Sequence, residues 1–267
     1  MNLMYYHNHM VEVVALVLMM AGSINFALHA MVWRGGFDQL RKNLEIRVLA
    51  FVTAAMCGLV GVGMAYADWS GGAAGVFRKG VFHVFSGHSA GHQTVYPSQF
   101  VNDFSGVGLM AIMLGMAVGG SLSSTGGGFK ALRVGVLVKS ILLHIKQSLA
   151  PRSASLVIRY NHLGERVLTP ELTGAVATVF LLYLGTYLMG GIAGAAYGYG
   201  ASEAMFESIS ATANSGLSIG ITSATMPTGL KLVYMFQMWA GRLEFISVLV
   251  LVAQLVLALD PRRLGRR

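Results

Sequence analysis

The chain has 267 residues, of which 55% are hydrophobic and only 11% charged, and its mean hydropathy is +0.63. Soluble domains carry about 25% charged residues, so this composition excludes an ordinary soluble protein and indicates a membrane protein in a lipid bilayer. The formal net charge of +8 by itself excludes little. The single cysteine, Cys57, excludes a disulfide or a thiolate metal site within the chain.

Apolar segments recur along the chain. Four of them are long enough to cross about 30 Å of hydrocarbon, and they cover residues 11–33, 46–67, 171–198 and 230–259. A fifth, 104–118, is shorter and runs into a stretch rich in glycine and serine. Beyond that stretch the chain resumes as a basic but apolar helix over 129–149. We therefore expect one helix, broken in the middle, over 104–149.

The basic residues indicate the orientation in the membrane. Fifteen of the 19 Lys and Arg residues lie in three clusters, 34–47, 130–166 and 262–267. The positive-inside rule places such clusters in the cytoplasm. Residues 1–10 and 87–103 contain no Lys or Arg and are expected outside. The charge is thus a topology signal and no nucleic-acid partner is expected. The sequence predicts a multi-pass protein of the plasma (inner) membrane with a cytoplasmic C-terminus.

Two stretches expected outside resemble each other. Phe82 and Ser86 in the first match Phe206 and Ser210 in the second, and both pairs are 124 residues apart. Each stretch is too short to cross the bilayer and lies between two spanning segments. This arrangement is typical of an internal repeat in which a helix, a re-entrant short helix with its loop, and a second helix follow one another.

We therefore expect an all-α membrane protein with two helix–pore-loop–helix repeats and one preceding transmembrane helix. The linker between the repeats contains SLVIRY and ERVL on either side of Asn161-His162-Leu163-Gly164, a pattern that predicts a small cytoplasmic hairpin. The predicted divisions are 1–33 for the last helix of a preceding repeat, 34–149 for a repeat with a broken second helix, 150–170 for the hairpin linker, and 171–267 for the final repeat and a basic tail.

The loops after the two short helices are candidate ion filters. Irregular backbone survives at membrane depth only where protein buries it or where it lines a watery cavity. A short helix followed by a glycine-containing loop can present carbonyl oxygens that replace the hydration shell of a cation. Ordinary turn glycines are the alternative, although the matched positions in a repeat favour a filter. The candidate residues are Ser89, Ala90, Gly91 and His92 in the first loop, and Asn214, Ser215, Gly216 and Leu217 in the second.

The stretch 119–128 interrupts an apolar helix with small and hydroxyl residues. It cannot be a phosphate-binding loop, because Lys130 is followed by Ala131 and the preceding segment spans the membrane. Apolar helix on both sides also argues against a domain linker. A kink for helix packing and an unwound segment beneath a filter both remain open. The residues concerned are Gly119, Gly120, Ser121, Ser123, Ser124, Thr125, Gly126, Gly127 and Gly128.

Arg242 lies about a dozen residues into the last apolar segment. An ionisable residue at such depth is costly and usually faces the protein interior with a partner. Glu244 is two residues on and therefore on a different face of the helix. Arg242 is expected to pair with another acidic group or with backbone carbonyls of the 119–128 loop. It would then act as an electrostatic barrier beside a cation path or as a structural link between helices.

Histidines near the first candidate filter give weak support for a metal site. His83 and His88 are five residues apart, His92 lies beyond Gly91, and no carboxylate is close to them in the sequence. The serines of the candidate filters have no convincing base and acid beside them, so an enzyme is not expected. No metal other than a transported ion and no covalent cofactor is expected.

Four longer motifs carry a resemblance to a known family. GGSLSSTGGGFKALR, MFQMWAGRLEFISVLVL, FESISATANSGLSIG and SINFALHAMVWRGG closely resemble segments of the Trk/Ktr/HKT potassium transporters, in particular the bacterial TrkH/KtrB membrane subunits. The resemblance runs essentially end to end. It implies four helix–pore-loop–helix repeats around one K⁺ pathway, a homodimer, and a cytoplasmic nucleotide-binding partner of the TrkA/KtrA type.

The resemblance also assigns roles to residues. It implies that 119–128 is an intramembrane gating loop, that Arg242 helps close the pathway, and that Gly91 and Gly216 are the filter glycines of repeats three and four. The chain corresponds only to those repeats and the last helix of the second, so the missing N-terminal repeats would come from the same gene, a partner chain or a second copy. Two departures from the family pattern leave selectivity for K⁺ over Na⁺ open. His92 follows Gly91, and the first filter loop is one residue shorter than the second.

The expected function is K⁺ uptake across the plasma membrane, with this chain as half of a gated, channel-like transporter. The alternatives are a non-conducting fragment or membrane scaffold derived from that family, and a Na⁺-permeable variant.

Overall fold

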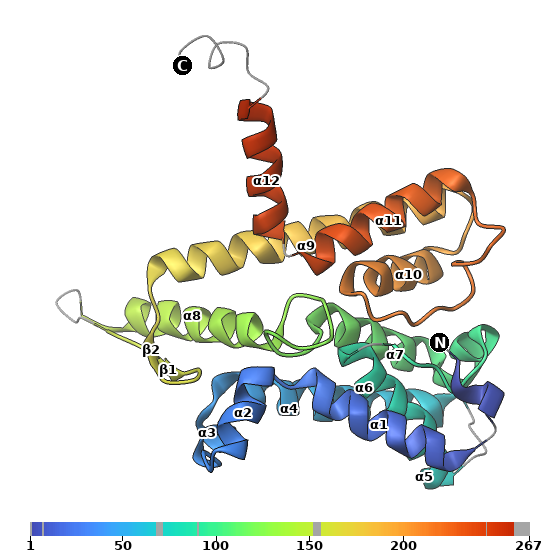
Figure 1. Ribbon diagram of the computed structural model, residues 1–267, viewed down its shortest axis with the longest axis horizontal. Coiled ribbons are helices and arrows are strands. Elements are labelled where there is room, and N and C mark those ends of the chain that lie inside the picture. The colour runs from blue at the N-terminus through green and yellow to red at the C-terminus, as the bar shows by residue number, and fades with distance from the viewer. Residues whose placement is uncertain are drawn as a thin grey trace.

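The computed structural model describes residues 2–6, 8–67, 72–89, 91–151, 156–243 and 245–258. Ala90, Glu244 and the basic cluster 262–267 lie outside these ranges. The protein is predominantly helical (Figure 1). Its elements are η1 (Leu3–Tyr6), α1 (His9–Ser23), α2 (Phe26–Trp33), α3 (Asp38–Lys42), α4 (Leu44–Tyr66), α5 (Gly72–Gly75), η2 (Val76–Val81), α6 (Phe82–His88), α7 (Pro97–Val118), α8 (Ala131–Leu149), β1 (Arg159–Asn161), β2 (Glu165–Val167), α9 (Pro170–Ala196), α10 (Ala201–Ala213), α11 (Thr228–Arg242) and α12 (Phe245–Ala258).

Several apolar segments form helices of membrane-spanning length. Within the described ranges, α4 and α9 are long and apolar enough to cross a membrane, and the bent pair α1–α2 would make a third span. The helix predicted over 104–149 is broken as expected, because α7 ends at Val118 and α8 begins at Ala131. The segment from 119 to 130 therefore joins two helices inside the body of the protein (Figure 1).

The first apolar segment differs from the single span expected over 11–33. Its two helices, α1 and α2, meet at 95°. Ile24 is extended at the junction, with φ −91° and ψ 146°. The side chain of Asn25 then starts α2 by accepting a hydrogen bond from the backbone nitrogen of Ala27 at 2.8 Å, which is the usual role of an N-cap asparagine. A polar cap and an extended residue thus interrupt an otherwise apolar run.

The last apolar segment, expected as one helix over 230–259, is also divided. α11 ends at Arg242, where Leu243 has φ −83° and ψ 1°. α12 then leaves the body of the molecule (Figure 1). The hairpin expected between the repeats is confirmed. β1 and β2 pair antiparallel, with Arg159 opposite Val167, and the turn between them uses positive φ values at Leu163 and Gly164.

Glycines allow α4 and α7 to pack closely. A Cβ on Gly63 of α4 would stand 2.4 Å from the backbone nitrogen of Gly108 on α7. Without side chains at this crossing the two backbones meet directly, which is how membrane helices gain packing contacts. α7 itself bends at Ser105, whose φ is 54°. The close crossing fixes α7, and with it the start of the 119–128 loop.

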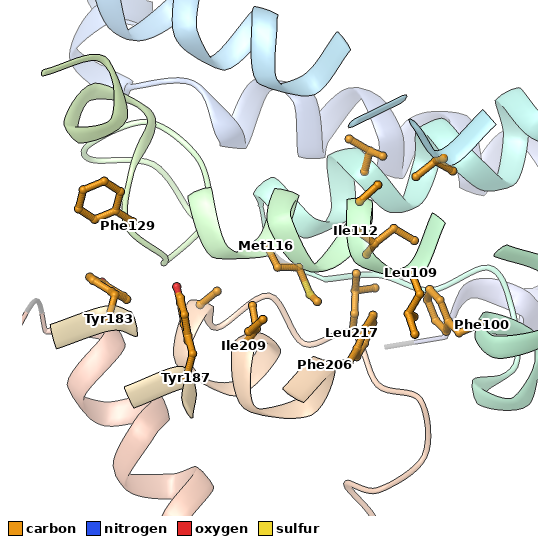
Figure 2. Packing of buried hydrophobic residues seen from close by; sticks show 14 of the residues in the cluster. Phe100, Leu109, Ile112, Met116, Phe129, Tyr183, Tyr187, Phe206, Ile209 and Leu217 are labelled. Atoms are coloured by element: carbon orange, nitrogen blue, oxygen red, sulfur yellow. The ribbon is translucent and has the colours of Figure 1, made fainter. Parts of the chain in front are cut away.

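The main hydrophobic core joins the helices that follow α4 to those that follow the hairpin. Figure 2 shows Met116 of α7 facing Ile209 of α10, with Ile112 farther along α7 beside Leu109. The rings of Phe100 and Phe206 pack with their centroids 5.4 Å apart. These side chains are all largely buried. Because α7 and α10 share one core, the loops that follow the two short helices are held in a fixed relation.

Candidate functional site

The two candidate filter loops lie against each other. A Cβ on Gly91 would stand 1.4 Å from the carbonyl oxygen of Ser215, and a Cβ on Gly216 would be 3.6 Å from the carbonyl oxygen of Gly91. Gly216 has φ +79°, a conformation that L side chains rarely adopt. Gly91 is thus required by space and Gly216 by its backbone angle. Segments more than 120 residues apart are brought together, although Ala90 lies outside the described residues.

Equivalent serines fix a carbonyl in each loop. The hydroxyl of Ser86 donates to the carbonyl of His92 at 2.6 Å, and the hydroxyl of Ser210 donates to the carbonyl of Leu217 at 2.6 Å. Both serines are buried. The separation is six residues in the first loop and seven in the second. The same contact is therefore kept across the one-residue difference that the sequence shows.

A second matched contact holds the chain beyond each loop. Nε2 of His83 accepts from the backbone nitrogen of Thr94 at 3.3 Å, while Nδ1 faces the carbonyl of Lys79 at 2.6 Å. In α10, at the position that the sequence comparison aligns with His83, Oε1 of Glu207 accepts from the backbone nitrogen of Ile219 at 3.0 Å. Sequence reasoning did not single out Glu207, although its place directly after the aligned Phe206 is a signal that could have identified it.

Gln93 ties the two loops to each other. Its side-chain nitrogen donates to the carbonyl of Ser218 at 2.8 Å, and its side-chain oxygen accepts from the backbone nitrogen of the same residue at 3.3 Å. Gln93 is buried. A buried amide that satisfies both ends on one backbone residue fixes distance and orientation together. Sequence reasoning missed this residue, because a lone glutamine after a loop carries no pattern.

The 119–128 loop is anchored on the end of α1. The backbone nitrogen of Ser121 donates to the carbonyl of Ser23 at 2.9 Å, and that of Thr125 donates to the carbonyl of Gly22 at 3.0 Å. The hydroxyl of Thr125 reaches the same Gly22 carbonyl at 3.0 Å. These carbonyls are available because α1 ends here at the 95° bend. The bend and the loop thus satisfy each other's backbone groups, which is necessary inside a membrane.

The same loop contacts both short helices. The backbone nitrogen of Gly127 donates to the carbonyl of Ala213 at 2.9 Å, and Nδ1 of His88 lies 2.9 Å from the carbonyl of Gly119. A Cβ on Gly126 would stand 2.3 Å from the carbonyl oxygen of His88. The absence of side chains in this part of the loop therefore permits it to lie directly against the ends of α6 and α10.

Two cationic side chains bind the loop through neighbouring carbonyls. Nη1 of Arg242 donates to the carbonyl of Thr125 at 2.7 Å, and Nζ of Lys130 donates to the carbonyl of Gly126. Of the two kinds of partner expected for Arg242, the structure has the loop carbonyl. Glu244, the acidic residue two positions after Arg242 in the sequence, lies outside the described residues. Arg242 is exposed on the surface of this chain, whereas Lys130 is buried.

A cavity connects the first candidate filter loop with the 119–128 loop. It has a volume of about 450 Å³ and is lined by Ser89, His92 and Thr125 on one side. The rest of its wall is apolar and belongs to α1. The polar lining of this cavity is thus confined to three residues, which belong to the first candidate filter loop and the 119–128 loop. Within the described residues, no group of three His, Cys, Asp or Glu could hold a metal ion.

Comparison with known proteins agrees with these features. The family model TrkH, described as cation transport protein, matches residues 43–257. An uncharacterized cation transporter of Methanocaldococcus jannaschii is 27% identical over 256 residues, which is 95% of this chain and 50% of that protein. The crystal structure of the potassium transporter TrkH from Vibrio parahaemolyticus has the same fold, with a TM-score of 0.77 at 21% identity, over 97% of this chain and 54% of that one.

The chain spans about half the length of the relatives that it matches. The family model covers far more than half of this chain, from α4 into α12. Together with the helical membrane fold, this match shows membership of a family of transport proteins and not of an enzyme family. The chain belongs to the TrkH family of cation transport proteins.

Proposed function

We propose that this chain forms half of a K⁺ pathway, with its filter in the loops 89–92 and 214–217 and its gate in the 119–128 loop. The observation that carries the proposal is the contact between these three segments. The candidate filter glycine Gly91 lies against Ser215, and Gly126 and Gly127 lie against the carbonyls that end the two short helices. A filter and a constriction directly beneath it are the parts that a gated cation channel requires.

The matched contacts support a pair of helix–pore-loop–helix repeats. Ser86 and Ser210 each fix a loop carbonyl, and His83 and Glu207 each hold the chain beyond it. Contacts that recur at equivalent positions are expected when two repeats face a common pathway. α4, α6 and α7–α8 would form one repeat, and α9, α10 and α11–α12 the other.

The proposed gate opposes cation flow by position and by charge. Thr125 of the loop lines the same cavity as Ser89 and His92. Arg242 fastens this part of the loop through Thr125 and adds a positive charge beside the path. A fixed cation next to a narrow pathway is an electrostatic barrier to K⁺. Release of the loop and of Arg242 together would therefore open the path.

Two loops cannot surround an ion, so the rest of the pore must come from further sequence or from a partner chain. The relatives are about twice as long as this chain, which supports two further repeats. We propose a homodimer in the plasma membrane, with a cytoplasmic nucleotide-binding subunit of the TrkA/KtrA type acting on the side that carries the basic clusters 34–47 and 130–166.

K⁺ uptake in a bacterial strain that lacks its own K⁺ uptake systems tests this function. The chain is expressed alone and together with the segment encoded next to it, and growth at low K⁺ is measured beside Rb⁺ uptake. The combined form is expected to restore growth. Failure of both forms, with the protein present in the membrane, would contradict transport and favour a non-conducting scaffold. Rescue that is matched by equal Na⁺ entry would favour the Na⁺-permeable variant.

Deletion of 121–127 in the conducting form tests the gate. The shortened loop no longer reaches the carbonyls of Gly22 and Ala213, so basal Rb⁺ flux is expected to rise. Unchanged or lower flux in protein that is correctly inserted would overturn the gate assignment while leaving the filter assignment in place.

A further inference from the structure

A buried carboxylate outside the proposed pathway holds the 119–128 loop. Glu45, in the first turn of α4, is completely buried. Its Oε1 accepts a hydrogen bond from the backbone nitrogen of Leu122, and its Oε2 faces the side-chain nitrogen of Asn25 at 3.4 Å. The charge of Lys130 also acts on it. One carboxylate thus connects α4, the cap of α2 and the loop.

The hairpin β1–β2 reaches this carboxylate from the other side. Nδ1 of His162, in the hairpin turn, lies 3.6 Å from Oε2 of Glu45. That nitrogen is buried and makes no hydrogen bond within the described part of the chain. The hairpin is itself held on the protein by Leu168, which belongs to the main core, and by Lys139 of α8, whose Nζ lies 3.4 Å from the carbonyl of Arg159. Because His162 lies beside Glu45, a small shift of the hairpin would change the surroundings of this carboxylate.

We propose that Glu45 is a positioning residue of the 119–128 loop and that the β1–β2 hairpin acts on the loop through His162. The inference rests on the proposed function only where it calls that loop a gate. An ionised carboxylate is costly to bury unless hydrogen bonds satisfy it. While the hairpin covers Glu45, water cannot reach the carboxylate. The hydrogen bond from the amide of Leu122 is then kept, because no water molecule can take its place. Lifting the hairpin would admit water to Glu45 and weaken its hold on Leu122.

The groups around His162 determine how protons act on this contact. Glu45 faces it from α4, and Arg166 acts on it from β2. The charge of Lys130 acts on Glu45. Burial, followed by the positive charge of Arg166, lowers the pKa of His162 below its ordinary value of 6.5. A released hairpin would return the histidine to that value, so protons bind the released form more tightly. Acidification below about pH 6.5 should therefore favour release of the hairpin and loosen the loop.

Hydrogen exchange of the loop amides tests the inference without reference to transport. The full-length protein in lipid nanodiscs is compared with the Glu45→Ala, Glu45→Gln and His162→Gln variants, and exchange of a peptide that contains Leu122 is followed. Loss of a hydrogen bond to a charged acceptor should speed exchange in Glu45→Ala by roughly tenfold. Glu45→Gln keeps an oxygen acceptor and should restore much of the protection. Exchange in Glu45→Ala equal to that of the parent would overturn the positioning role.

The pH arm tests the hairpin. Exchange of the same peptide should accelerate in the parent between pH 7.5 and 5.5, after correction for the intrinsic rate, and this acceleration should be absent in His162→Gln. Glu165→Gln is the matched control, because Glu165 is on the same hairpin, is exposed, and pairs with Arg159. A parent without pH dependence, or a His162→Gln variant that keeps it, would overturn the part assigned to His162. The pH experiment does not need the Glu45→Ala variant, so it can be carried out even if that variant does not fold.

Cation flux measured on the same samples separates this inference from the proposed function. Altered loop exchange without any flux in the parent would contradict transport and leave the positioning role intact. Flux in the parent with loop exchange that no variant changes would support transport and contradict the positioning role.

Discussion

Gly91 and Ser215 meet so closely that the carbonyl oxygen of Ser215 occupies the space of a Cβ on Gly91, at 1.4 Å. Backbone opposes backbone here, so no side chain can rotate away. Gly91→Ala should push the two loops apart and reduce Rb⁺ flux of the conducting form by about tenfold or more, since overpacking of this kind costs roughly 1–3 kcal/mol. Flux is measured in reconstituted vesicles.

Gly58 provides the control for this substitution. It lies within α4, and a Cβ on it would meet nothing within 4 Å. Gly58→Ala should leave flux unchanged and favour the helix by about 0.5–1 kcal/mol. Equal flux in both alanine variants would show that the two loops are not in contact in the conducting protein.

Removal of the Arg242 charge should raise basal flux. Arg242→Gln loses the charged hydrogen bond to Thr125, and because the arginine is exposed on this chain we expect about 1 kcal/mol, or roughly fivefold in the closed-to-open ratio. Single-channel or vesicle recordings without the regulatory partner measure it. Lys146→Gln is the matched control, since Lys146 is an exposed cation in the last turn of α8, away from the 119–128 loop. A rise in both variants would point to a general charge effect.

Substitution of the two matched serines, Ser86 and Ser210, should reduce selectivity to different extents. Ser86 both donates to the His92 carbonyl and accepts from the His92 backbone nitrogen at 2.7 Å. Ser210 donates to the Leu217 carbonyl, and its hydroxyl lies 3.1 Å from that of Ser215, which also donates to the sulfur of Met116. Ser86→Ala leaves both the N–H and the carbonyl of His92 unpaired, and each costs about 1–3 kcal/mol. Ser210→Ala leaves one backbone carbonyl unpaired, because the Ser215 hydroxyl keeps its contact with Met116. Ser86→Ala should lower the K⁺ to Na⁺ permeability ratio more than Ser210→Ala does. Reversal potentials in mixed K⁺ and Na⁺ solutions measure the ratio.

Gln93→Ala should loosen one loop relative to the other. The substitution removes both hydrogen bonds to Ser218, and we expect a loss of about 1–3 kcal/mol of loop stability with reduced selectivity. Gln93→Glu keeps the acceptor but replaces the donor, so it should be worse than Gln93→Ala at neutral pH. Gln147 on α8 is exposed, and Gln147→Ala serves as the control. Selectivity that Gln93→Ala does not change would remove this residue from the filter.

Much of the fold was predictable because it depends on local patterns. The spans of α4 and α9 follow from hydropathy, the hairpin turn follows from Asn161–Gly164, and the interruption after α7 follows from the small residues of 119–128. The divisions of the first and last apolar segments were not predictable. An apolar run has the same composition whether straight or bent. The bend after Ser23 is recognisable only once a loop from about 100 residues further along is known to bind its carbonyls.

The candidate site could be recognised in the sequence where residues recur or cluster and not where they stand alone. Gly91, Gly216 and the 119–128 loop carry patterns. The cost of a charge at depth indicates that Arg242 has a partner but leaves open whether that partner is an acidic group or a loop carbonyl. Glu45 looks like an ordinary acidic residue in the first turn of a helix, where the helix dipole favours it. Its buried contact with Leu122 depends on tertiary structure that no local pattern encodes.

The hydrogen bond from Gly127 to Ala213 has a consequence for the energy of an ion. Ala213 and His88 end the short helices α10 and α6, and the carbonyls at a helix C-terminus carry partial negative charge. The loop covers both with Gly126 and Gly127. A loop that withdrew would uncover two negative helix ends as it cleared the route. One movement would then remove an obstacle and create an attractive position for a cation, so the ion itself would stabilise the open form.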